Sequence, residues 1–82
     1  MFKELDVVAL AHDIRPDPAK DMPAAGMKAG ETGTIVFVLG DNEAFMVEFV
    51  RRDGYTTALL TLEANDIRPL QRAELEQLRV SA

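Results

Sequence analysis

The stretch GTIVFVLGDNEAFMVEFVRRDGYTTALLTL, residues 33–62, decides the fold of this chain. It contains three runs rich in β-branched and aromatic residues: GTIVFVL at 33–39, EAFMVEFVR at 43–51 and YTTALLTL at 55–62. Runs of this kind, separated by turn residues, indicate β-strands. The second linker is Asp53-Gly54, and an Asp-Gly pair favours a tight hairpin because both of its turn positions need a positive φ. The stretch therefore predicts three antiparallel strands in sequence.

Two further strands are expected around this meander. Residues 5–12, LDVVALAH, are rich in valine and leucine and predict a first strand. Residues 63–70, EANDIRPL, predict a brief edge strand after a tight turn, because Pro69 cannot donate a hydrogen bond to a sheet. Residues 13–32 hold three prolines and two glycines, a density of breakers that predicts a long loop after the first strand.

The C-terminal residues predict a short helix. In QRAELEQLR, residues 71–79, Leu75 and Leu78 fall on one side of the helix. Nine residues do not hold a helix in water without packing. We therefore expect an all-β barrel domain over residues 1–70, followed by a short helix or tail over residues 71–82.

The hairpins assign side chains to the two faces of the sheet. Counting back from the loop at 40–43 pairs Phe37 with Met46 and Val36 with Val47, and counting back from Asp53-Gly54 pairs Val47 with Leu60. Opposed residues share a face and successive residues alternate. The inner face, which carries no charge and should form the core, collects Thr34, Val36, Val38, Phe45, Val47, Phe49, Ala58, Leu60 and Leu62. The outer face collects Ile35, Phe37, Leu39, Met46, Glu48, Leu59 and Thr61, with Val50 and Thr57.

The outer face is more apolar than a solvated sheet face needs to be. One explanation is that the chain covers this face itself, with Leu75 and Leu78 of the helix or with Met22 and Met27 of the long loop. The other is that it docks a partner protein or a second copy, because contiguous exposed apolar patches usually mark interaction surfaces. A register error of one residue would exchange the two faces.

The segment GETG, residues 30–33, raises the question of a phosphate-binding loop. A Walker loop needs a Lys-Ser or Lys-Thr after its glycines, and a dinucleotide fingerprint needs a helix to follow, whereas here a strand follows. A KH-type clamp favours basic residues, and Glu31 has the opposite charge. We predict instead that Gly30 and Gly33 supply turn conformations and that Thr34 starts the strand.

The residue inventory excludes most site chemistry. The chain has no cysteine, so it has no disulfide and no thiolate ligand. His12 is its one histidine, without a visible nucleophile or second histidine for a metal. We therefore expect no enzyme activity, no cofactor, no metal and no small-molecule substrate. No run approaches the roughly 20 apolar residues that cross a bilayer, so we expect a cytoplasmic protein outside the membrane.

The charge balance argues against a nucleic-acid partner. The chain carries 14 acidic and 9 basic residues, a net charge of -5, and its basic residues are scattered. Nucleic-acid binders usually show a basic stripe, because neutralising phosphates supplies most of their affinity. Arg51 and Arg52 form one adjacent pair, which could contact an acidic partner, and Tyr55 beside them offers a polar aromatic contact.

Several pieces of the chain resemble a known family. FKELDVVAL, GTIVFVLGD, AFMVEFV and DGYTTALLTLEANDIRPL occur in the same order in the short prokaryotic proteins catalogued as domain of unknown function 4926, a resemblance over residues 2–70. It implies a small five-stranded SH3-like barrel and no established activity. It also implies a gene neighbour encoding another short protein, which would suit a paired or antitoxin-like role. The chain departs from the family pattern in the longer 16–29 loop, and in Phe37 where a polar residue is common.

We therefore expect a non-enzymatic interaction module that binds one protein partner, or itself as a homodimer, through the outer sheet face. The expected contact residues are Ile35, Phe37, Met46, Leu59, Tyr55, Arg51 and Arg52. The alternative is a nucleic-acid-associated domain, because AGETGTIVFVL also resembles the loop-strand unit of KOW-type domains. Binding to nucleic acid should weaken steeply with salt, whereas docking through an apolar face should not.

Overall fold

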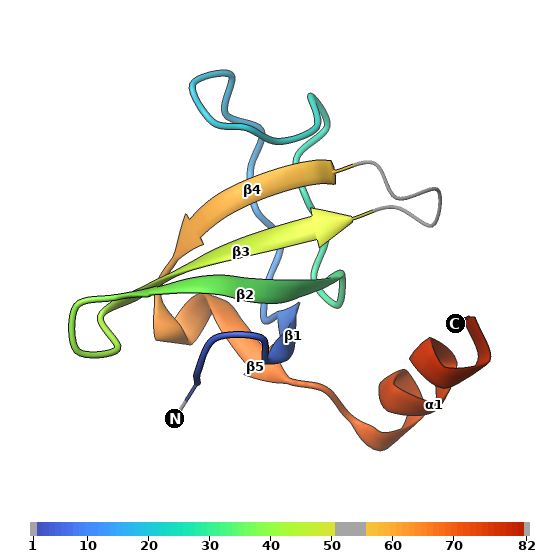
Figure 1. Ribbon diagram of the computed structural model, residues 1–82. Helices are drawn as coiled ribbons and strands as arrows, with labels where there is room; N and C mark the ends of the chain where they lie inside the picture. Colours follow the sequence, from blue (N-terminus) through green and yellow to red (C-terminus); the bar gives the residue numbers. More distant parts are fainter. Residues whose placement is uncertain (1, 51–55, 82) are drawn as a thin grey trace.

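The computed structural model describes residues 2–50 and 56–81. The strands are β1 (Val7–Leu10), β2 (Thr32–Leu39), β3 (Ala44–Val50), β4 (Thr56–Leu62) and β5 (Ile67–Pro69). They form one antiparallel sheet in the order β4-β3-β2-β1-β5, with β4 and β5 at its edges (Figure 1). A 3-10 turn, η1 (Ala64–Asp66), leads into β5, and the helix α1 (Arg72–Ser81) follows it. The expectation of a five-stranded, mostly β fold with a short C-terminal helix is confirmed.

Turn residues explain where the strands begin and end. β1 starts at Val7, later than predicted, because a turn precedes it: Leu5 has a φ of 72°, and the Lys3 backbone N–H donates to Asp6 Oδ2 at 3.0 Å. β5 ends at Pro69, which lies at the sheet edge as predicted. The predicted Asp53-Gly54 turn between β3 and β4 lies outside the described residues.

The predicted strand register holds over most of the meander. Between β3 and β4 the observed pairs include Phe45–Leu62, Met46–Thr61, Val47–Leu60, Glu48–Leu59 and Phe49–Ala58, as predicted. Between β2 and β3 the three pairs nearest the hairpin loop also match the prediction, namely Phe37–Met46, Val38–Phe45 and Leu39–Ala44. Between β3 and β4 the register shifts after Phe49, so that Val50 pairs with Thr56 and not with Thr57. Counting from the loop at 40–43 therefore locates the pairs next to that loop correctly.

Further from that loop, a β-bulge at Val36 overturns the prediction. Ile35 pairs with Val47 and Thr34 with Glu48, so Val36 is an extra residue in β2 with no partner in the register. A bulge inserts one residue and reverses the faces of those beyond it. Ile35, expected on the outer face, is fully buried, and Val36, expected in the core, is 39 % exposed.

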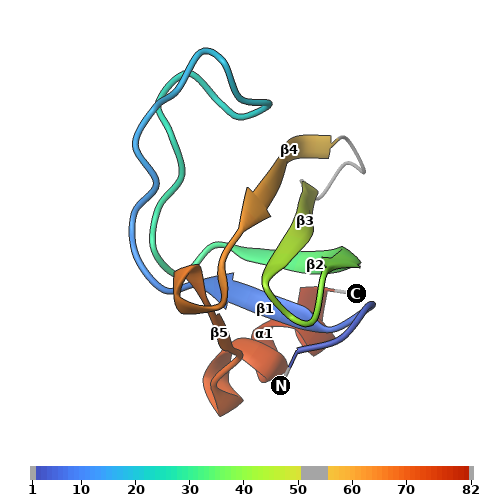
Figure 2. The same cartoon turned by 90° about the vertical axis from the view of Figure 1, so that its left-hand side faces the viewer.

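The core lies on the concave side of the curled sheet, and the long loop stands over that side (Figure 2). Its buried members are Val8, Leu10, Met27, Ile35, Phe45, Val47, Phe49, Ala58, Leu60, Leu62 and Ile67. The loop contributes Met27 directly, and Met22 packs against the same cluster. Two backbone hydrogen bonds join Ile14 and Met27 across the loop, and Leu59 of β4 donates to the Asp21 carbonyl at 3.0 Å. The loop is therefore part of the packed domain.

The two glycines of GETG are required for different structural reasons. Gly30 has a φ of 89°, which confirms its predicted turn conformation. The prediction for Gly33 is wrong, because this residue lies inside β2, which starts at Thr32. A Cβ at Gly33 would lie 2.8 Å from Val47 Cγ1 and 2.9 Å from the Glu48 carbonyl oxygen. Gly33 is therefore required by close packing against β3.

Substitutions at these glycines should separate the two causes. Gly33→Ala should lower the free energy of unfolding by about 3 kcal/mol, since the strand backbone cannot move aside easily. Gly30→Ala should cost only about 1 kcal/mol, the penalty of a left-handed alanine, because nothing lies within 4 Å of its added Cβ. Asparagine should reduce the penalty at Gly30 and increase it at Gly33. Urea unfolding of the four variants measures this, and an equal response at both positions would contradict it.

Candidate interaction surface

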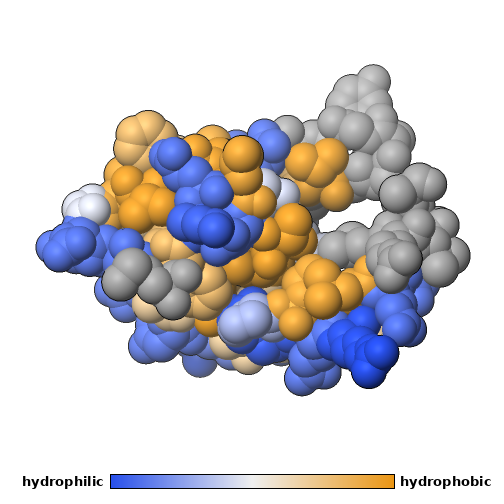
Figure 3. All heavy atoms as spheres, turned by 60° about the horizontal axis from the view of Figure 1, so that its bottom comes forward, coloured by the Kyte–Doolittle hydropathy of each residue, from blue (hydrophilic) through white to orange (hydrophobic). Residues whose placement is uncertain are grey.

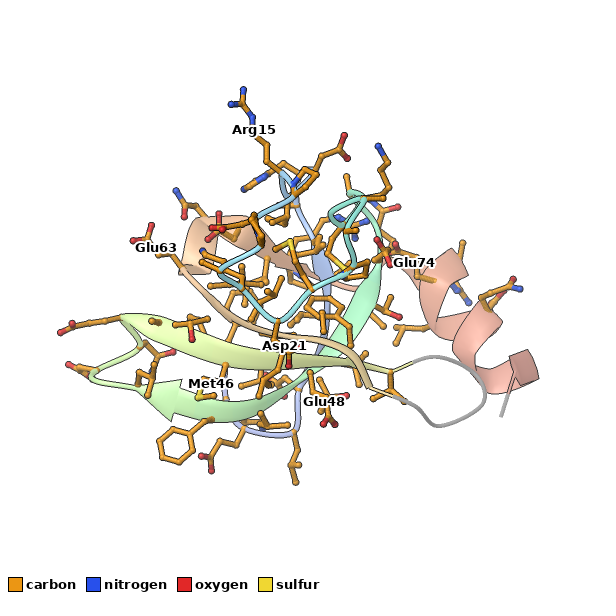
Figure 4. The ribbon with its side chains drawn as sticks, turned by 90° about the horizontal axis from the view of Figure 1, so that it is seen from above. Arg15, Asp21, Met46, Glu48, Glu63 and Glu74 are labelled. Atoms are coloured by element: carbon orange, nitrogen blue, oxygen red, sulfur yellow. The ribbon has the colours of Figure 1, made fainter. Side chains whose placement is uncertain are left out.

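Cross-strand rows of side chains build the outer face of the sheet, which is the face turned away from the core. Opposed residues in neighbouring strands point to the same side. The rows are Arg68–Ala9–Thr32, then Val7–Thr34–Glu48–Leu59, then Phe37–Met46–Thr61. Met46 and Glu48 extend from β3 on this face (Figure 4). The face therefore combines apolar side chains with threonines and one central carboxylate.

An apolar patch lies on this face around the bulge. We define it by Leu5, Val7, Val36 and Phe37, of which Phe37 is 52 % and Leu5 79 % exposed. Leu5 lies beside the bulge, because its backbone N–H donates to the Ile35 carbonyl at 2.7 Å. Figure 3 shows hydrophobic residues gathered across this side of the molecule, with hydrophilic residues around and between them. The patch is a surface feature formed by β1, β2 and the turn before β1.

The structure brings together only some of the predicted contact residues. Phe37, Met46 and Leu59 share the outer face, with Met46 and Leu59 half-buried. Ile35 does not belong to this face, because the bulge turns it into the core. The remaining predicted contacts are Tyr55, Arg51 and Arg52, which lie outside the described residues. The nucleic-acid alternative, which rests on the KOW-like segment AGETGTIVFVL, stays a prediction.

Sequence reasoning found Phe37 but missed the other three residues of the patch. Val36 was assigned to the core because alternation along β2 carries no sign of the bulge. Leu5 and Val7 were assigned to a first strand whose register against β2 could not be counted across a 20-residue loop. The contact of β1 with β2 is long-range, and no short turn determines it.

In the part of the chain that the structure describes, one margin of the apolar patch is covered. The loop packs on the opposite side of the sheet, through Met22 and Met27, so the proposal that it covers the outer face is wrong. Leu75 of α1 reaches the side of Val7, while Phe37 remains half exposed. The side chain of Leu78 is outside the described part of the chain.

A pocket of about 300 Å³ opens beside the patch. It is formed by the N-terminal turn, β1, β5 and the first turn of α1, and its lining residues are Phe2, Asp6, Val7, Val8, Pro69, Leu70 and Leu75. Val7 belongs to both the pocket and the patch. The two features therefore form one continuous surface.

A bidentate ion pair holds α1 at the edge of this pocket. Arg68 Nη1 and Nη2 donate to the two carboxylate oxygens of Glu74 at 2.8 and 2.9 Å, and the Gln71 N–H donates to Glu74 Oε1 at 2.7 Å. Glu74 thus also satisfies a backbone donor at the helix start. The hydrogen bonds from Arg68, followed by that from Gln71, lower the pKa of Glu74 from 4.5 to about 2.

Acid should release α1 from β5. A carboxyl group whose pKa is lowered by folding stabilises the fold above its unfolded pKa of 4.5, and this stabilisation is lost as the pH falls through about 2. The Glu74 side-chain carbon should therefore titrate near pH 2 in an NMR experiment. In Arg68→Met, which keeps the apolar stem, the pKa should return toward 4.5. A midpoint near 4.5 in the wild type would contradict this ion pair.

His12 lies apart from the patch and links two distant segments. Its Nε2 bonds to Asp66 Oδ1 at 2.8 Å, and its Nδ1 bonds to the Asp13 carbonyl at 2.9 Å. These bonds raise the pKa of His12, with the Asp13 carbonyl as the larger cause. The side chain thereby joins the end of β1 to η1. Within residues 2–50 and 56–81, no three or more His, Cys, Asp or Glu side chains are grouped to hold a metal ion.

Comparison with known proteins places the chain in a family. No curated protein and no solved structure matches it. No helix among the described residues is long and apolar enough to span a membrane. The family model described as Domain of unknown function (DUF4926) matches residues 4–69, from the turn before β1 to the last residue of β5. Because this match covers most of the chain and includes the whole sheet, the protein belongs to the DUF4926 family.

Proposed function

We propose that this protein is a non-enzymatic interaction module that binds a protein partner through the outer face of its sheet. The observation that carries the proposal is Phe37, a large aromatic side chain left 52 % exposed next to the exposed residues Val36, Val7 and Leu5. Aromatic side chains supply much of the binding energy of protein interfaces. Contiguous exposed apolar patches on small domains usually mark such interfaces.

Met46 and Leu59 extend the proposed contact area on the same face. Both are half-buried, so each presents part of its side chain to a partner while the remainder packs within the protein. Phe37 of β2 and Met46 of β3 are directly opposed, so they present adjacent apolar side chains to a partner from the rigid sheet. Sites built on strands hold their geometry better than sites on loops.

We also propose that the curled sheet is an SH3-like barrel. Three features support this: β1 lies between β2 and β5, a long loop follows β1, and η1 leads directly into β5. The bridge from Asp21 to Leu59 covers part of the β4 edge. Covering or closing the sheet edges protects a small β domain from edge-to-edge association. The fold by itself assigns no function, which depends on the site that it presents.

The test is affinity capture from an extract of the native cell with three tagged baits. Phe37→Asp places a charge in the patch, and Ala25→Asp places the same charge on the exposed tip of the loop. Both variants should fold, because both positions are exposed. The wild type and Ala25→Asp should recover the same protein in similar amounts. Phe37→Asp should recover at least about tenfold less of it.

Two outcomes would contradict the proposed function. Equal recovery by all three baits would place the binding site elsewhere on the molecule. The proposal would also fail if the wild type recovered no protein and did not self-associate at high concentration. Circular dichroism of each bait should accompany the capture, so that a loss is assigned to the surface and not to unfolding.

A further inference from the structure

We propose that the partner presents a cationic amphipathic segment, with a lysine or arginine whose apolar stem enters the pocket beside Val7 and whose charged end pairs with Asp6. This inference rests on the proposed function, because it names the class of partner for the same surface. It is carried by the pocket lining and by the distribution of charge around the apolar patch.

The pocket combines apolar walls with one carboxylate. Phe2, Val7, Pro69 and Leu75 supply apolar lining, and Asp6 is its one ionisable lining residue. The carboxylate of Asp6 is half-buried and is held in place because its Oδ2 accepts the Lys3 backbone N–H at 3.0 Å. Its other oxygen makes no hydrogen bond within the described part of the chain. One acceptor therefore remains for a ligand in this pocket.

A lysine or arginine side chain matches these walls better than a wholly apolar one. An apolar side chain in the pocket would remove water from Asp6 without giving it a partner, which is unfavourable. Lysine and arginine lay their methylene stems along apolar surfaces while the charged end reaches a polar group. A volume of about 300 Å³ has room for one such side chain. The pocket therefore favours an anchor that is both long and cationic.

Acidic side chains lie at two places beside the apolar patch. In the N-terminal turn, Glu4 directly precedes Leu5. At the far end of β2, the hairpin that follows Phe37 and precedes Met46 carries Asp41 and Glu43. Among the described side chains of the N-terminal turn, this hairpin and the outer face, the basic ones are Lys3 and Arg68, and Arg68 is already paired with Glu74. Figure 3 shows hydrophilic residues bordering the hydrophobic ones on this side.

This charge pattern favours a cationic partner over a second copy of the chain. A symmetric dimer formed through the patch would bring the same acidic groups of both copies together, and like charges across an interface are costly. The net charge of -5 adds to this repulsion. A segment with an apolar stripe flanked by lysines would instead gain from the same field.

The experiment uses a designed probe, because the natural partner is unidentified. A 14-residue peptide of leucine and lysine, spaced to form an amphipathic helix, is titrated into the full 15N-labelled chain. A matched peptide carries glutamate at each lysine position. We expect the lysine peptide to bind, with the largest NMR shift changes at Leu5, Asp6, Val7 and Phe37, and the glutamate peptide not to bind.

Two isosteric variants test the role of Asp6. Asp6→Asn keeps an oxygen that accepts the Lys3 N–H, so the turn should persist. This variant should bind the lysine peptide about tenfold more weakly than the wild type does. Asp21→Asn removes the same charge from the long loop and leaves the hydrogen bond between the Asp21 backbone carbonyl and Leu59 of β4 in place. This variant should change the affinity for the lysine peptide less than twofold. The comparison separates a specific pair from general attraction between charged molecules.

The other outcomes are distinct. If both peptides bind at the patch, the interaction surface stands but the cationic anchor is wrong. If Asp21→Asn weakens binding as much as Asp6→Asn, or if shifts spread over acidic residues far from the patch, the attraction is unspecific and the inference fails. If the lysine peptide does not bind at the patch, the inference also fails, while the capture experiment still decides the proposed function. Dimerisation of the free chain through Phe37 would make a second copy the occupant instead.

Discussion

Ile35→Asp should leave the protein unfolded at 25 °C, whereas Val36→Asp should leave the fold intact. Ile35 is fully buried against Phe45 and Val47, so an aspartate there would place an unpaired charge in the core. That cost is at least several kcal/mol, comparable to the roughly 3–5 kcal/mol of net stability that a domain of this size usually has. Val36 is 39 % exposed, and its substitution should cost about 1 kcal/mol or less.

Circular dichroism and urea unfolding of the two variants measure this difference. A milder pair keeps the experiment quantitative if Ile35→Asp does not express: Ile35→Ala should cost about 2–5 kcal/mol, and Val36→Ala about 1 kcal/mol or less. An uninterrupted register from the hairpin loop predicts the reverse, with Val36 in the core. Greater sensitivity at Val36 would therefore show that the bulge is absent.

Met27→Ala should lower the melting temperature by at least about 10 °C. Met27 is buried among the strands although it belongs to the long loop, and truncating a buried methionine costs about 2–5 kcal/mol. For a domain of this size, each kcal/mol corresponds to about 4–8 °C. The backbone hydrogen bonds between Ile14 and Met27 should persist, so the effect reports the loss of the side chain from the core.

Met22→Ala is the matched control for this experiment. Met22 packs against the same core cluster from the same loop but is only half-buried, so its truncation should shift the melting temperature less than half as much. Differential scanning calorimetry measures both variants. Equal small shifts would contradict a loop packed into the core, and would leave it as a mobile connection between β1 and β2.

Local signals in the chain were enough to place the strands. β-branched and aromatic runs and turn residues located β2, β3 and β4 within one residue, and Pro69 placed the short edge strand β5 within residues 63–70. Pairing near a short loop was also predictable, because the loop sets which residues face each other, as Phe37 and Met46 do. The outer-face positions of Phe37, Met46 and Leu59 follow from this local information.

The position of the apolar patch was not predictable in the same way. In TIVFVL the residues from Ile35 to Val38 are all apolar, so the alternation of polar and apolar residues that identifies a face is missing. The bulge at Val36 therefore leaves no trace in the pattern. The role of Gly33 was hidden for a similar reason, since its requirement comes from Val47 and Glu48 in the neighbouring strand.

The sequence by itself determined that this protein is an acidic, cysteine-free, five-stranded β domain with a long loop and a surplus of apolar residues in its meander. Only the tertiary structure decided that Ile35 is buried while Val36 is exposed, that Met27 enters the core, and that the pocket opens beside Val7. The physical reason is how far apart in the sequence the interacting residues lie. Strand formation and tight turns depend on residues a few positions apart, whereas the bulge, the loop contact and the pocket depend on how distant segments pack together.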